Sequence, residues 1–168
     1  MSPELKAALQ LHQSGQAVDA LPLYAQALAA EPDNAAALFY GGVAAWTVGD
    51  AALALARLDR LITTTPQAVA EAHYHRGLAL TSLGREEEAS VDYEAALRLK
   101  PGMVAAHNNL GELHRKRRNF AGADASFAAA LQIDSSHVDA RYNRALNAMQ
   151  SGDLQRAHFA QRMHQTQP

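Results

Sequence analysis

Histidine is the side chain in this sequence with the clearest potential for metal chemistry, since eight histidines occur in 168 residues and cysteine is absent. The nearest two, His73 and His75, lie two positions apart in a stretch with helical character, so they point to different faces of a helix. A zinc site on one helix takes ligands at positions i and i+4. We therefore predict no metal site. The absence of cysteine also excludes disulfides, thiol catalysis and cysteine-bound zinc.

Residue patterns typical of catalysis are missing from the sequence as well. There is no glycine-rich phosphate loop, no nucleophile elbow and no paired-carboxylate cleft, and the serine, histidine and aspartate residues stand at unrelated positions. We predict no catalytic residue, no cofactor and no enzymatic activity. The longest apolar run, residues 35–46, is too short to cross a bilayer. A helix start at Ser2 stands where a secretory signal would begin, so we expect a cytoplasmic protein.

Charge is unevenly distributed along a chain whose net charge is −2. Residues 1–34 carry a net charge of −3, and residues 138–168 carry +2. A run of four cations at 115–118 favours the steering of an acidic partner segment, although a solvated turn would also account for it. We expect no nucleic-acid partner, because the sequence has no broad basic face.

A repeat of about 34 residues organises the elements that carry these side chains. It is marked by the alanines Ala20, Ala54, Ala89, Ala123 and Ala157. Five residues before these alanines stands a turn glycine (Gly15, Gly49, Gly84 and Gly152), with Arg118 as the exception. Twelve residues after the first three stands a proline. Because glycine ends one helix and proline follows the next, the pattern predicts helical hairpins at 1–34, 35–69, 70–103, 104–137 and 138–168, with one extra residue near Val69.

Two segments carry a resemblance to a known family. AHYHRGLALTSLGREEEASVDYEAALRLKPG at 72–102 and AHNNLGELHRKRRNFAGADASFAAALQID at 106–134 resemble the tetratricopeptide repeat (TPR). The resemblance implies an all-α fold, a right-handed α-solenoid of about five TPR hairpins. It also implies a single TPR domain over residues 1–168 with a degenerate, capping last repeat, and a concave groove, lined by the first helices, that binds peptides or partner helices.

One stripe of each first helix is predicted to face this groove. Its residues are aromatic and aliphatic in the N-terminal half, and they are amides and cations in the C-terminal half. The candidate ligand-binding residues are Phe39, Tyr40, Trp46, Tyr74, His75, Asn108, Asn109, Glu112, Arg115, Lys116, Tyr142 and Asn143. We expect a protein or peptide ligand with an apolar anchor at the aromatic residues and an acidic or polar portion at the others. The alternative is that the aromatic residues only pack between neighbouring helices.

The resemblance leaves three functions open. The first is a non-catalytic protein-interaction scaffold that binds a partner segment in the groove. The second is the substrate-recognition TPR segment of a larger enzyme, such as an O-linked N-acetylglucosamine transferase. Asn109 and Asn143 resemble the asparagine ladder of that enzyme family. Tyr40 and His75 stand at the same place in the second and third repeats, so the ladder is interrupted there. The third is a self-assembling structural scaffold. The carboxylate clamp of chaperone-binding TPR proteins is absent in every frame.

The end of the chain departs from the repeat pattern. Gln161 stands where an aromatic residue would contact a following repeat, which is typical of a terminal cap and of a complete chain. Phe159 and Met163 occupy solvent-facing places four residues apart. A homodimer through the C-terminal helix, or a docking site for further sequence, is therefore an alternative to a simple cap.

Overall fold

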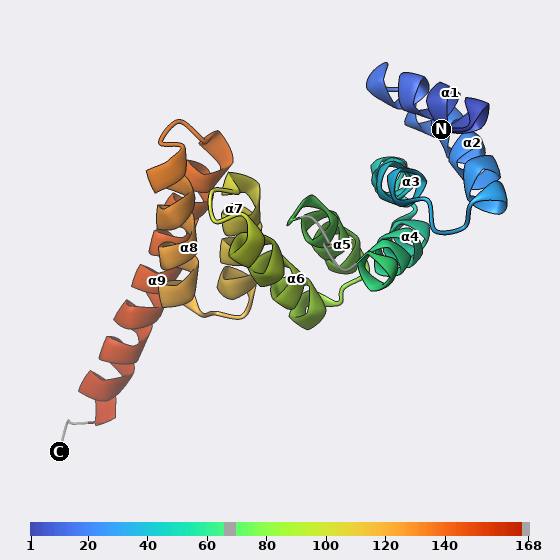
Figure 1. The fold of residues 1–168 in the computed structure, drawn as a ribbon. Coiled ribbons are helices and arrows are strands. Elements are labelled where there is room, and N and C mark those ends of the chain that lie inside the picture. Colours follow the sequence, from blue (N-terminus) through green and yellow to red (C-terminus); the bar gives the residue numbers. More distant parts are fainter. Residues whose placement is uncertain (66–69, 166–168) are drawn as a thin grey trace. The chain divides into compact units, whose positions relative to one another are not determined.

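The computed structural model describes residues 1–65 and 70–165, and for residues 153–165 it describes the backbone only. Every regular element in these ranges is an α-helix (Figure 1). The helices are α1 (Pro3–Gln13), α2 (Ala17–Ala30), α3 (Ala35–Thr47), α4 (Ala51–Thr64), α5 (Ala70–Ser82), α6 (Glu86–Leu99), α7 (Val104–Lys116), α8 (Phe120–Ile133) and α9 (Val138–Gln165). They belong to two compact units, an N-terminal unit (Met1–Pro101) and a C-terminal unit (Gly102–Pro168).

Consecutive helices pack against each other as hairpins within each unit. The N-terminal unit consists of α1/α2, α3/α4 and α5/α6, and in it each first helix also contacts the next first helix. The C-terminal unit consists of α7/α8 and of α9, which packs on both. The predicted all-α fold of stacked helical hairpins is confirmed. One domain over residues 1–168 remains a prediction.

Glycine ends the first helix of the first three hairpins, as the sequence predicts. Gly15, Gly49 and Gly84 have φ angles of 80°, 90° and 73°, in the left-handed region that residues with a Cβ atom avoid. The following N–H group then reaches back to a carbonyl of the last helical turn. Gln16, for example, donates to the carbonyl oxygen of Leu11 at 2.9 Å. This bond satisfies a carbonyl that the helix end would leave without a partner.

The fourth and fifth repeats differ at this position. Arg118 adopts a φ angle of 58° although it has a Cβ atom, and the N–H of Asn119 reaches back to His114 at 2.9 Å, so the fourth hairpin forms without glycine. The turn expected at Gly152 is wrong, because α9 continues through this residue to Gln165. Glycine permits a left-handed turn but does not require one, and inside a helix it costs only about 1 kcal/mol relative to alanine.

Small residues allow the two helices of a hairpin to approach closely. Gly42 lies against Leu58, Gly77 against Tyr93 and Gly111 against Phe127, and the Cβ of any larger residue would stand 2.6–2.8 Å from these side chains. Ala8 is equally buried in the first hairpin. Tyr93 and Phe127 are no more than 1% exposed. The many small residues thus allow the helix backbones to pack closely, and the few large side chains fill the space that remains between the helices.

The linkers between hairpins also follow the predicted pattern. The second helices α2 and α6 end two residues before Pro32 and Pro101. The linkers 31–34, 100–103 and 134–137 have four residues each. The extra residue expected near Val69 stays a prediction, because residues 66–69 lie outside the described residues.

Candidate functional site

The N-terminal unit brings together all five of its predicted ligand-binding residues. Phe39, Tyr40 and Trp46 come from α3, and Tyr74 and His75 come from α5. Ring centroids are 5.1 Å apart for Phe39 and Tyr40, 5.8 Å for Phe39 and His75, 6.4 Å for Trp46 and His75, and 5.2 Å for Tyr74 and His75. All four pairs are edge-to-face, the arrangement that aromatic quadrupoles favour.

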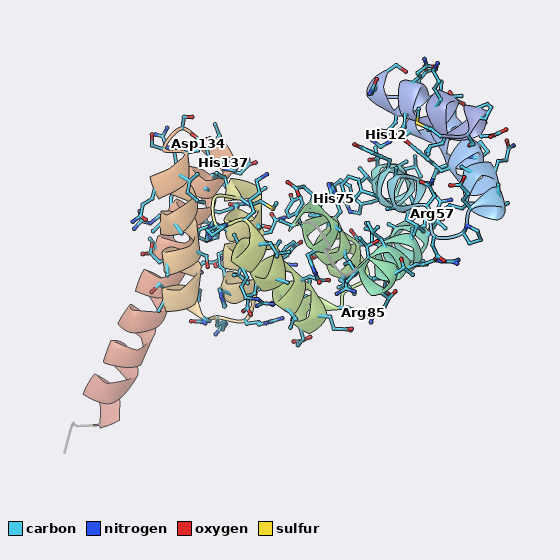
Figure 2. All side chains as sticks on the ribbon, viewed as in Figure 1. His12, Arg57, His75, Arg85, Asp134 and His137 are labelled. Carbon is cyan, nitrogen blue, oxygen red and sulfur yellow. The ribbon has the colours of Figure 1, made fainter. Side chains whose placement is uncertain are left out.

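A sixth ring, contributed by α1, extends this group. The imidazole of His12 lies 5.7 Å from the ring of Tyr40. His12 on α1 and His75 on α5 therefore both contact residues of α3, and both are marked in Figure 2. We call these six residues, His12, Phe39, Tyr40, Trp46, Tyr74 and His75, the aromatic row. None of the six is fully buried, and Tyr40 is 39% exposed.

Two nitrogen atoms of the aromatic row are buried without a hydrogen-bond partner. They are the Nδ1 atoms of His12 and His75. Burial lowers the pKa of both imidazoles, and for His75 the nearby Glu71 carboxylate opposes this effect while His12 adds to it. The row therefore favours neutral imidazoles. Its surface combines apolar ring edges with a few polar atoms, which is the composition of a binding site for an apolar side chain.

The C-terminal unit joins three predicted site residues in a hydrogen-bonded group. The amide nitrogen of Asn143 on α9 donates to Asn108 Oδ1 at 3.2 Å and to Glu112 Oε1 at 2.8 Å, both on α7. Asn108 and Asn143 are each 7% exposed. Because both amide hydrogens of Asn143 bond within the protein, this side chain has no donor left for a peptide backbone. Of the two asparagines that resemble a ladder, only Asn109 stays half-buried with no such bond.

The other predicted residues of this unit lie at or near its surface. Arg115 donates from Nη1 to Gln150 Oε1 at 3.3 Å, while its Nε atom is buried without a partner. Lys116 is exposed at the end of α7. Tyr142 is 67% exposed on α9. The side chains of Phe159, Gln161 and Met163, which the sequence associates with a cap or a dimer contact, lie outside the described residues.

An ion cluster centred on the buried Asp92 in the N-terminal unit was missed by sequence reasoning. Arg76 on α5 donates to both oxygens of Asp92 on α6 at 2.7 Å and to Asp59 on α4 at 2.8 Å, and His73 Nδ1 lies 2.9 Å from Asp92. The carboxylate of Asp92 is 2% exposed, and its hydrogen bonds raise the pKa of Arg76. Beside the cluster is a cavity of about 250 Å³. The residues of the ion cluster come from three helices, so the spacing of residues within one helix could not predict the cluster.

The described residues offer neither a metal site nor a transmembrane element. No group of three histidine or acidic side chains in that part of the chain lies close enough to hold a metal ion. None of the helices, as far as the chain is described, is long and apolar enough to span a bilayer.

Comparison with known proteins gives a consistent result along the chain. Sequence patterns described as tetratricopeptide repeat match residues 11–81, 70–103, 91–138 and 108–162. Human tetratricopeptide repeat protein 13 is 30% identical over 159 residues, which is 92% of this chain but only 18% of that protein. The chain thus spans about a fifth of the length of this curated relative.

Solved structures show the same fold. The crystal structure of MamA superposes with a TM-score of 0.81 at 20% identity, covering 90% of this chain and 86% of that one. YrrB, described as a TPR protein with an unusual peptide-binding site, superposes with a TM-score of 0.77 at 21% identity, covering 89% and 77%.

Proposed function

Because the chain belongs to the tetratricopeptide repeat family, whose domains are generally protein-interaction modules, we propose that it binds a peptide or a segment of a partner protein without catalysing a reaction. The aromatic row is the observation that carries this proposal. Six rings from α1, α3 and α5 meet on one surface of the N-terminal unit and are still partly exposed. Stacked side chains that only filled a core would be covered.

The chemistry of the row indicates the kind of anchor it binds. Neutral imidazoles and ring edges favour an apolar side chain such as leucine, methionine or phenylalanine, because burying such a group between rings removes apolar surface from water. YrrB, with its peptide-binding site, provides a precedent for such a role in a similar fold.

The C-terminal unit supplies the second half of the proposal. Asn109, Arg115 and Lys116 lie on α7 and present an amide and two cations, which suit acidic or polar groups of the same partner. Asn108, Glu112 and Asn143 have a different role in this proposal: they hold α7 and α9 together. A homodimer through α9 is compatible with this function, since the aromatic row lies on α1, α3 and α5.

A peptide-array screen followed by affinity measurements tests the apolar half. Tyr40→Ala removes the most exposed ring of the row, and we expect the best apolar-anchored peptides to bind about 5- to 100-fold more weakly, the equivalent of about 1 to 3 kcal/mol. Val91→Ala is the matched control, because Val91 is 61% exposed on α6 and is not part of the row. Equal affinities for both variants and the unmodified chain would contradict the proposal.

A double substitution tests the polar half. Arg115→Ala combined with Lys116→Ala should weaken acidic peptides and reduce the dependence of their affinity on salt, because screening acts only on charges that take part. Neutral apolar peptides should bind as before. An unchanged salt dependence would exclude these cations from the binding surface.

A further inference from the structure

An apolar stripe on α9 is exposed to solvent, and the residues equivalent to its central alanine are buried in each of the other repeats. Val138, Tyr142 and Met149 are 74%, 67% and 67% exposed, and Ala145 between them is exposed as well. Their spacing of four, three and four residues places all of them on one face of the helix. We call these residues the α9 stripe. In the preceding repeats, the residues equivalent to Ala145 (Ala8, Gly42, Gly77 and Gly111) are all buried.

The reason for the difference lies in the second helix of each repeat. Gly42, Gly77 and Gly111 are covered by residues 16 positions later, Leu58, Tyr93 and Phe127. For Ala145 the residue in that register is Gln161. Since α9 runs without a break through Gly152, it carries Gln161 about 24 Å along the helix axis from Ala145, at 1.5 Å per residue. The helix cannot cover its own stripe.

A cavity next to the stripe points to the same missing helix. It has a volume of about 370 Å³ and is lined by residues of α8 and α9, among them Phe120, Asp124 and Ala148. Asn147 also lines it; this side chain is 2% exposed, and its Oδ1 atom has no hydrogen-bond partner. In α5, the residue equivalent to Ala148 is Leu80, which is 3% exposed, whereas Ala148 is exposed.

The chain contains a sequence of suitable length for this place. The second helices α2, α4, α6 and α8 each have 14 residues. Sixteen residues follow Gly152, and Ala157 continues the alanine period of the earlier second helices. The part of α9 after Gly152 thus corresponds in register to a fifth second helix that is not in contact with its own first helix.

We propose that residues 153–165 of a second copy of this chain pack on the α9 stripe and along the adjacent cavity, and that the two copies exchange these segments reciprocally. The continuity of α9 favours a second copy over folding back within one chain, because folding back requires the helix to break at Gly152. Each copy donates one segment and receives one, so the contact is closed and two-fold symmetric. The contacts formed between the two copies are the same as those that form within one chain in the other hairpins.

An engineered cysteine pair tests this arrangement directly, since the natural chain has no cysteine. Ala145→Cys combined with Gln161→Cys places the two thiols in the register that joins Gly77 to Tyr93 and Gly111 to Phe127. Under mild oxidation of the full chain, we expect a disulfide-linked dimer on a non-reducing gel. Light scattering should show a dimer for the unmodified protein, and neither single-cysteine variant should cross-link at a comparable rate.

Other outcomes would overturn the proposal. A monomer with an internal disulfide would mean that the segment folds back on its own chain. A monomer without a disulfide would mean that the stripe stays uncovered. Cross-linking through Ala145→Cys alone would indicate that two stripes face each other. Loss of the dimer leaves peptide binding at the aromatic row untouched, so the two proposals fail separately.

Gly152→Ala provides a second, independent variant. Alanine stabilises a continuous helix relative to glycine and disfavours a left-handed turn, so the fraction of dimer should stay the same or increase. A fall in the dimer fraction would show that a hinge at Gly152 is needed, which contradicts exchange through an unbroken α9.

Discussion

Gly77 on α5 lies so close to Tyr93 on α6 that a Cβ atom on Gly77 would stand 2.6 Å from Cε1 of the ring. The ring is 1% exposed and surrounded by packed residues, so it has little room to move. We predict that Gly77→Ala lowers the free energy of unfolding by about 1 to 3 kcal/mol through overpacking. Gly102→Ala is the control, because no atom lies within 4 Å of its added Cβ. Urea denaturation distinguishes the two, and equal stability of both variants would contradict the close contact.

Arg118 adopts the left-handed conformation that glycine adopts in the first three hairpins. Replacing it with glycine removes the steric cost of its Cβ atom, so we predict that Arg118→Gly raises the free energy of unfolding by about 1 kcal/mol. Arg118→Ala removes the same charge but keeps the Cβ atom, and it should bring no such gain. Chemical denaturation of the three proteins measures the difference. A gain that both variants share would assign the effect to charge.

Asp92 accepts hydrogen bonds from Arg76 in a largely buried position. Asp92→Asn removes the buried carboxylate and leaves the guanidinium with the exposed Asp59 as its charged partner. We predict a loss of about 3 to 5 kcal/mol in the free energy of unfolding, because the buried half of the pair is lost. Asp33→Asn removes the exposed Arg60–Asp33 pair instead and should cost less than about 1 kcal/mol. If the two substitutions cost the same in thermal or urea unfolding, the ion cluster has no special role in stability.

His75 has a lowered pKa in the folded protein because burial disfavours the imidazolium. The unfolded chain therefore binds more protons than the folded one as pH falls below about 6.5, and stability should decrease in that range. We predict that the free energy of unfolding falls between pH 7.5 and pH 5.5, and that His75→Gln makes this fall shallower. His12→Gln should act in the same direction. Urea denaturation at several pH values tests this, and an unchanged slope in both variants would contradict it.

Asn143 and Asn109 should behave differently when replaced by alanine. Asn143→Ala removes both donors to Asn108 and Glu112, so we predict a loss of about 1 to 3 kcal/mol in stability. Asn109 is half-buried, with no such bond, and Asn109→Ala should change stability by less than about 0.5 kcal/mol while weakening polar peptide ligands. Thermal unfolding and peptide affinity, measured on both variants, separate a structural role from a binding role.

The hairpins of this protein could be predicted from the sequence because their determinants are local and repeated. Three kinds of residue define each hairpin: a glycine that ends the first helix, a small residue where the second helix packs closely, and a proline after the second helix. Each affects the structure of its own hairpin, and each recurs at about the same spacing. The α3 and α5 residues of the aromatic row were predictable for the same reason, since helical periodicity alone places Tyr40 and His75 on corresponding faces of their helices. Whether these residues bind a ligand stays a prediction.

Contacts between helices determined two features that the repeat pattern could not predict: the hydrogen-bond partners of Asn143 and the absence of a turn at Gly152. The pattern assigns Asn143 to the groove, but the opposing α7 supplies two acceptors that bind its amide hydrogens. Likewise, Gly152 has the same sequence position as Gly15, Gly49 and Gly84, yet only those three form a turn. A glycine lowers the cost of a turn, whereas the helix that packs back afterwards supplies the free energy to form it. That packing depends on tertiary partners, which no single repeat encodes.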